Sequence, residues 1–104
     1  MTSQVDLRET ANAIVVAISG ELDAAAATGL RDQLISMIPS GSVVRLDLSG
    51  LTYISSAGLR TLLLAYRHAR GEGSEVTLSG IRDEVRFVMS ATGFLSLFEI
   101  EEAT

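Results

Sequence analysis

The chain has 104 residues, of which 47% are hydrophobic, and it carries a formal net charge of −5 at pH 7. This length predicts one domain spanning residues 1–104, and the acidic balance disfavours nucleic-acid or anionic-membrane partners. The absence of cysteine excludes disulfides and thiolate metal sites, and we expect no metal or cofactor. Residues 1–7 do not resemble a signal peptide and no apolar run reaches about 18 residues, so we expect a cytoplasmic protein.

Alternating apolar residues near the beginning of the chain predict two paired strands. Val5 and Leu7 alternate with charged neighbours, and residues 13–19 form a largely apolar, β-branched run after a turn at residues 10–12. The short connection favours an antiparallel hairpin. Gly20 is expected to end the second strand.

A first helix is expected between Asp23 and Pro39. Asp23 is a favourable N-cap, and apolar residues follow it at helical spacing up to Ile38. Gly29 falls inside this predicted helix and would cost about 1 kcal/mol relative to alanine. Pro39 and Gly41 are expected to stop the helix.

The rest of the chain alternates strands and helices. The predicted elements are a strand over residues 43–48, a loop over 49–55, a helix from Ser55 or Ser56 to about Gly71, a strand over 75–79 and a helix from about Asp83 to Gly93. Residues 97–100 add a last short strand or pack as coil. The order β-β-α-β-α-β-α predicts a two-layer α/β domain with a mixed sheet of four to five strands. The helices should lie mainly on one face, leaving the other more polar.

Two predicted loops follow the carboxyl ends of strands, one with Glu21 and Asp23 and the other with Tyr53, Ser55 and Ser56. Because such loops gather at one edge of a parallel sheet, we expect Asp23 and Ser56 to lie near each other. A serine before a helix is most often a simple cap, and here the cap is Ser55 or Ser56. A phosphate on such a serine would face free amides and the positive end of the helix.

Four segments in and around these loops form a recognisable set: Gly20-Glu21-Leu22-Asp23, Leu46-Asp47-Leu48-Ser49-Gly50, Ile54-Ser55-Ser56-Ala57-Gly58-Leu59 and Ala91-Thr92-Gly93-Phe94. These segments resemble the STAS family, specifically its stand-alone anti-sigma-factor antagonists. They occur in the family's order over nearly the whole chain, and the serine–glycine turn is the most specific. The resemblance implies that Ser56 is a phosphoacceptor, with Ser55 as its rival. The implied partner-binding residues are Glu21, Asp23, Tyr53, Ser55, Ser56, Ala57 and Gly58.

The resemblance also implies a partner-switching cycle. The unphosphorylated antagonist binds a serine-kinase anti-sigma factor or a similar inhibitor, and thereby frees the inhibitor's target. The kinase then phosphorylates the serine with ATP, the complex dissociates, and a metal-dependent serine phosphatase resets the antagonist. ATP and metal belong to those partners, so the chain itself is expected not to be an enzyme.

Two alternatives remain open beside the switch. Ser55 stands where many family members carry aspartate, and this departure favours a non-switching STAS scaffold or sensor subunit. Ala57 stands where a hydroxylated residue is common, and neither departure removes the acceptor itself. A serine hydrolase is disfavoured, because it needs a base beside its nucleophile. His68, the only histidine, follows Ser56 by twelve residues on the same predicted helix, about 18 Å away at 1.5 Å per residue.

Overall fold

The computed structural model describes residues 4–101 and contains a five-stranded sheet in the order β1-β2-β3-β4-β5. Its strands are β1 (Gln4–Glu9), β2 (Ile14–Leu22), β3 (Val43–Ile54), β4 (Glu75–Ser79) and β5 (Ile100–Glu101). Its helices are α1 (Ala24–Ala27), α2 (Leu30–Met37), α3 (Ser56–Gly71), α4 (Asp83–Ala91) and the short 3-10 helix η1 (Leu95–Leu97). The first two strands pair antiparallel and all other neighbours pair parallel, which confirms the predicted mixed sheet.

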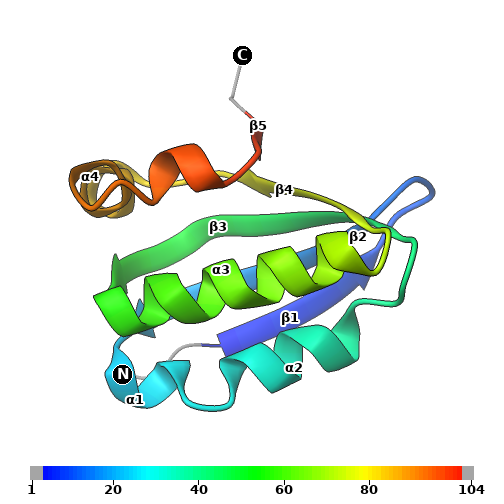
Figure 1. The fold of residues 1–104 in the computed structure, drawn as a ribbon, viewed down its shortest axis with the longest axis horizontal. Helices are drawn as coiled ribbons and strands as arrows, with labels where there is room; N and C mark the ends of the chain where they lie inside the picture. The colour runs from blue at the N-terminus through cyan, green and yellow to red at the C-terminus, as the bar shows by residue number, and fades with distance from the viewer. Residues whose placement is uncertain (1–3, 102–104) are drawn as a thin grey trace.

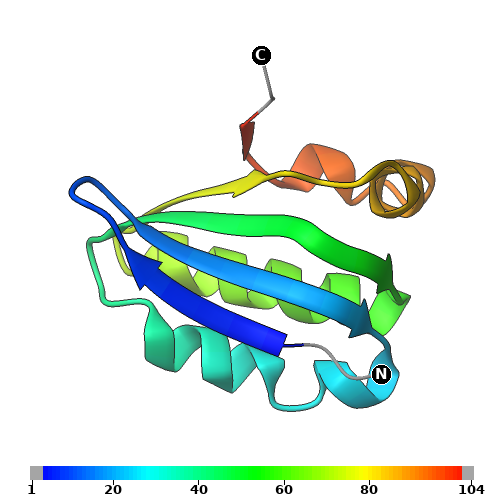
Figure 2. The same cartoon turned by 180° about the vertical axis from the view of Figure 1, so that it is seen from behind.

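Helices α1, α2 and α3 cover one face of the sheet (Figure 1). Figure 2 shows the opposite face, where no helix lies over the strands. Side chains that point to this open face carry ion pairs, one between Arg8 and Asp47 at 4.0 Å and one between Arg45 and Glu101 at 2.8 Å. The prediction of one helix-covered face and one more polar face is therefore confirmed.

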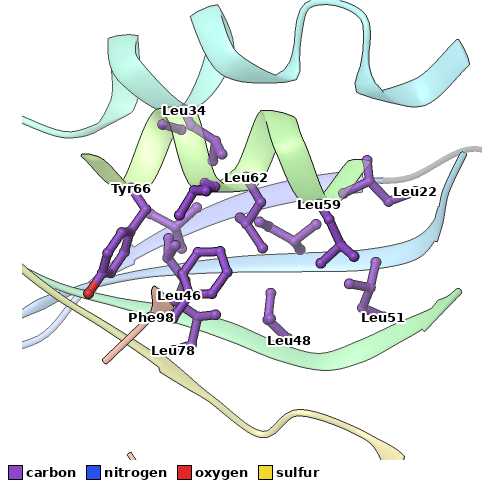
Figure 3. Packing of buried hydrophobic residues seen from close by; sticks show 14 of the residues in the cluster. Leu22, Leu34, Leu46, Leu48, Leu51, Leu59, Leu62, Tyr66, Leu78 and Phe98 are labelled. Atoms are coloured by element: carbon purple, nitrogen blue, oxygen red, sulfur yellow. The ribbon is translucent and has the colours of Figure 1, made fainter. Parts of the chain in front are cut away.

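The core lies between the sheet and α3 (Figure 3). Leu46, Leu48 and Leu78 from the strands meet Leu59 and Leu62 from the helix, and none of the five is more than 1% exposed. Burying each such side chain contributes roughly 1.5–3 kcal/mol. This apolar stripe fixes the rotation of α3 about its axis and turns the opposite, polar side of the helix toward solvent.

The prediction of one continuous helix from Asp23 to Pro39 is wrong, because the chain breaks into α1 and α2. The predicted N-cap is confirmed, since Oδ1 of Asp23 accepts a hydrogen bond of 2.8 Å from the Ala26 amide. Thr28 is extended, and Gly29 then adopts a φ of +85°. Only glycine takes this left-handed conformation without strain. Gly29 therefore redirects the chain between two helices and does not lie in a helix interior.

Strands β2 and β3 also run beyond their predicted ends. Residues 49–55 were predicted as a loop, but β3 continues through most of them to Ile54, paired with a β2 that extends past Gly20 to Leu22. Two register shifts interrupt this pairing, and they break the strict alternation of buried residues that marks a strand in sequence.

Gly50 allows the two strands to stay paired through this irregular stretch. A Cβ atom at this position would lie 2.8 Å from the Cβ of Ser19, closer than side chains approach one another. The glycine therefore serves a close approach within the sheet. As a result, paired backbone reaches the edge where the predicted site lies.

Tyr66 of α3 holds the last segment against the core. Its hydroxyl accepts hydrogen bonds of 2.8 Å from the Glu99 amide and from Nη1 of Arg70. Its ring meets Phe98 edge to face, with centroids 4.9 Å apart. The hydrogen bond from Arg70 to Tyr66 raises the pKa of that guanidinium. Residues 97–100, predicted as strand or coil, form the end of η1, a short connection and the start of β5.

Candidate functional site

The candidate site lies at the edge of the sheet where β2 and β3 end. Leu22 and Ile54 are paired in register, so Asp23 and Ser55 each follow directly after paired positions. The backbone amide of Ser55 donates a hydrogen bond of 2.9 Å to the carbonyl of Leu22. Asp23 caps α1 and Ser55 caps α3, and both helices begin at this same end of the molecule (Figure 1). The predicted proximity of the two loops is confirmed.

Ser55 is the N-cap of α3, which decides between the two predicted caps. Its Oγ accepts a hydrogen bond of 3.0 Å from the amide of Gly58 and donates one of 3.1 Å to the carbonyl of Leu22. The residue is half-buried. The hydroxyl of Ser55 is thus engaged both as acceptor and as donor in joining β2 to α3.

Ser56 differs from Ser55 in its position in the helix, its burial and its hydrogen bonding. It is the first residue of α3, it is exposed, and its hydroxyl makes no hydrogen bond to another residue within the described range 4–101. The first turn of a helix leaves backbone amides without intrahelical partners and carries a partial positive charge. An anionic group on this hydroxyl would therefore be stabilised, not repelled, by the helix.

Gly58 lies beneath this surface. A Cβ atom there would lie 2.7 Å from the carbonyl oxygen of Leu22 and 2.9 Å from the Cγ of the same residue. Glycine is required for α3 to approach the end of β2 this closely. Gly58 therefore positions the serine turn from below, while the two residues before it, Ser56 and Ala57, are exposed.

The other residues predicted to contact a partner are distributed around Ser56. Glu21 and Tyr53 are paired across β2 and β3, and Tyr53 is 49% exposed. Of the seven predicted positions, five are exposed, one is half-buried and one is buried. The exposed ones are Glu21, Asp23, Tyr53, Ser56 and Ala57, the half-buried one is Ser55, and the buried one is Gly58.

An open pocket beside Ser56 contains residues that the sequence analysis missed. It is lined by Ser56, Ala57, Arg60, Thr61 and Phe94. The position of Arg60 follows from helical spacing, because it comes four residues after Ser56 and shares its side of α3. No local pattern predicts that Phe94, which follows α4, comes to lie against the first turns of α3.

His68 lies far from this pocket on the same helix. It is exposed and follows Ser56 by more than three turns of about 3.6 residues each. This placement agrees with the reasoning that disfavoured a serine–histidine pair. Within residues 4–101, no helix is long and apolar enough to cross a membrane.

Comparisons with known proteins identify the family to which this architecture belongs. A family model described as "Mlab, STAS domain" matches residues 5–99. The chain is 36% identical over 88 residues to BtrV of Bordetella bronchiseptica, covering 84% of this chain and 76% of that protein. It is 26% identical over 100 residues to the anti-sigma-B factor antagonist of Bacillus subtilis, covering 96% and 92% of the two chains.

The fold is likewise shared with solved structures. A crystal structure of an anti-sigma factor antagonist from Mycobacterium paratuberculosis superposes with a TM-score of 0.81 at 21% identity, covering 95% of this chain and 85% of that one. The matched family model and the 36% identical relative together show that this chain belongs to the STAS domain family.

Proposed function

We propose that the chain is an anti-sigma-factor antagonist whose binding to a serine-kinase anti-sigma factor, or a similar inhibitor, is released by phosphorylation of Ser56. The observation that carries this proposal is the contrast between two adjacent serines. The Ser55 hydroxyl is half-buried and hydrogen-bonded to Leu22 and Gly58, whereas Ser56 is exposed and free of such bonds within residues 4–101. The relatives named as anti-sigma factor antagonists support the same role.

The proposed modification is a phosphoryl transfer from ATP held by the kinase partner. A bond forms between Oγ of Ser56 and the γ-phosphorus, and the bond from that phosphorus to the β–γ bridging oxygen breaks. ADP leaves, and the hydroxyl proton passes to a base of the kinase. Hydrolysis of the phosphoserine by a metal-dependent phosphatase restores the hydroxyl. In this account the chain is a cytoplasmic substrate and ligand of its partners, not a catalyst.

The phosphate acts at the interface and leaves the fold intact. It adds about two negative charges at a helix N-terminus, where they are electrostatically favourable. The same charges lie among the exposed side chains of Ala57 and Tyr53, against which a partner would pack. A docked partner would have to remove water from the phosphate, and this cost falls on the complex alone.

Partner capture with two variants tests the proposal. S56A keeps the surface uncharged and is expected to retain a partner from an extract of the source cells, whereas S56D is expected to lose it. Gln33→Glu, which places a new charge on the exposed surface of α2, is the control and should bind as the unmodified chain does. The recovered partner, mixed with the unmodified chain and ATP, should transfer one phosphate and dissociate.

The outcome also separates the switch from the non-switching alternative. A scaffold or sensor subunit would bind S56A and S56D equally and would gain no phosphate from its partner. That result would overturn the proposed switch. The replacement of the family's frequent aspartate by Ser55 is the feature that makes this comparison necessary.

A further inference from the structure

We propose that Arg60 receives the phosphate of phosphorylated Ser56, so that the modified group folds back over the pocket and is held there as an ion pair within α3. This inference rests on the proposed function, in which Ser56 is the acceptor. It assigns to Arg60 a role in the phosphorylated state.

The spacing of the two residues on α3 suits this contact. Positions four apart on a helix are neighbours, with Cβ atoms about 5–6 Å apart. An anion that precedes a cation by four residues is the favourable order, because it also agrees with the helix dipole. Arginine and phosphate form paired, charge-assisted hydrogen bonds. Ser56 and Arg60 therefore have both the spacing and the order that such a pair requires.

The pocket between them leaves room for the phosphate. Both residues line it, together with Ala57, Thr61 and Phe94. Arg60 is exposed and forms no ion pair or hydrogen bond to another residue in the described part of the chain, so no existing contact must be broken. Thr61 offers a hydroxyl at the same wall, and Phe94 closes the side formed by the segment after α4.

The charges around the pocket identify Arg60 as the receiver. It is the only charged residue among those that line the pocket. The charged residues of the neighbouring β2 end are Glu21 and Asp23, which would repel a phosphate. The segment after α4 contributes the uncharged Phe94. The phosphate is therefore drawn along α3 toward Arg60 and away from the acidic side of the site.

The pairing has a consequence for the switch. A phosphate held against Arg60 lies over Ala57 and occupies the pocket that an unmodified surface leaves open. Phosphorylation then removes an open pocket and an unpaired cation from the docking surface, in addition to placing negative charge on it.

The test uses the full chain with phosphoserine installed at position 56 during synthesis, and follows its phosphorus NMR signal through a pH titration. The phosphate changes from monoanion to dianion during the titration, and the positive charge of Arg60 favours the dianion. Arg60→Gln should therefore raise the midpoint of this ionisation by about 0.2–0.4 pH units, the value expected for an exposed helical ion pair. Arg67→Gln is the matched control, because Arg67 is exposed on the same helix eleven residues from Ser56. In 1 M salt the difference between the phosphorylated chain and its R60Q variant should shrink.

An unchanged midpoint in R60Q, or an equal rise in R60Q and R67Q, would overturn the pairing. Because the phosphate is installed without a kinase, this result is independent of whether any partner modifies Ser56. Failure of partner release in the capture experiment would refute the proposed function, while the NMR titration would still decide whether Arg60 holds the phosphate.

Discussion

The Ser55 hydroxyl donates a 3.1 Å hydrogen bond to the carbonyl oxygen of Leu22, and so ties the start of α3 to the end of β2. The hydroxyl oxygen of Ser55 also accepts a 3.0 Å hydrogen bond from the amide of Gly58. The side chain of Ser55 thus joins β2 to α3, and Ser56 takes no part in these two hydrogen bonds. The following residue is left exposed on a fixed support, which is the arrangement that a modifiable hydroxyl needs.

The two serines should respond differently to alanine substitution. Ser55→Ala removes the cap of α3 and its bond to Leu22, and is expected to lower the free energy of unfolding by about 1 kcal/mol, within a range of roughly 0.5–2. Ser56→Ala removes an exposed group and should change it by less than about 0.5 kcal/mol. Urea denaturation of both variants measures the difference. Equal losses would contradict the assignment of Ser55 as the structural serine.

The close approach of α3 to β2 at Gly58 leads to a second prediction. Gly58→Ala forces a Cβ atom to 2.7 Å from the carbonyl oxygen of Leu22 and should destabilise the fold by about 1–3 kcal/mol. Gly71→Ala is the matched control, because nothing lies within 4 Å of its Cβ position at the end of the same helix. That variant is expected to be stabilised by about 0.4–1 kcal/mol. Thermal unfolding checks both signs, and a neutral G58A would contradict the tight contact.

The break between α1 and α2 gives a prediction whose sign is diagnostic. Gly29 has a φ of +85°, so Gly29→Ala should destabilise the fold by about 1 kcal/mol even though nothing lies within 4 Å of its Cβ position. In a continuous helix the same substitution would stabilise by about the same amount. Chemical denaturation of G29A therefore distinguishes two helices from one.

The errors of the sequence-based prediction have two physical causes. Apolar residues between Asp23 and Pro39 keep helical spacing across Gly29, so periodicity alone cannot reveal that the backbone turns there. The register shifts between β2 and β3 destroy the alternation that would have extended the strands to Leu22 and Ile54. The first feature is a local backbone conformation at Gly29, and the second depends on pairing between two strands that are distant in sequence.

The site was more predictable than these boundaries. The loops with Asp23 and Ser56 follow parallel strands, and topology alone brings them to one edge. The division of roles between Ser55 and Ser56 needed the structure, because it depends on the carbonyl of Leu22, 33 residues away along the chain. The structure was also needed to show that Phe94 lines the pocket beside Ser56, since no local pattern places the segment after α4 beside α3.

Tyr66 should control the attachment of the last segment. Tyr66→Phe removes the oxygen that accepts hydrogen bonds from the Glu99 amide and from Arg70, and is expected to destabilise the fold by about 1–3 kcal/mol. Tyr53→Phe is the control, because this exposed hydroxyl makes no hydrogen bond to another residue in the part of the chain that the structure describes. Hydrogen exchange should show faster loss of protection at Glu99 in Y66F alone. Unchanged protection there would contradict the anchoring role.

The most direct test of the central claim is to map the phosphorylated residue by tandem mass spectrometry after the chain has reacted with its captured partner and ATP. The account predicts a single phosphate on Ser56, absent from S56A and still formed in S55A molecules that remain folded. A phosphate found on Ser55, or retained by S56A, would contradict it.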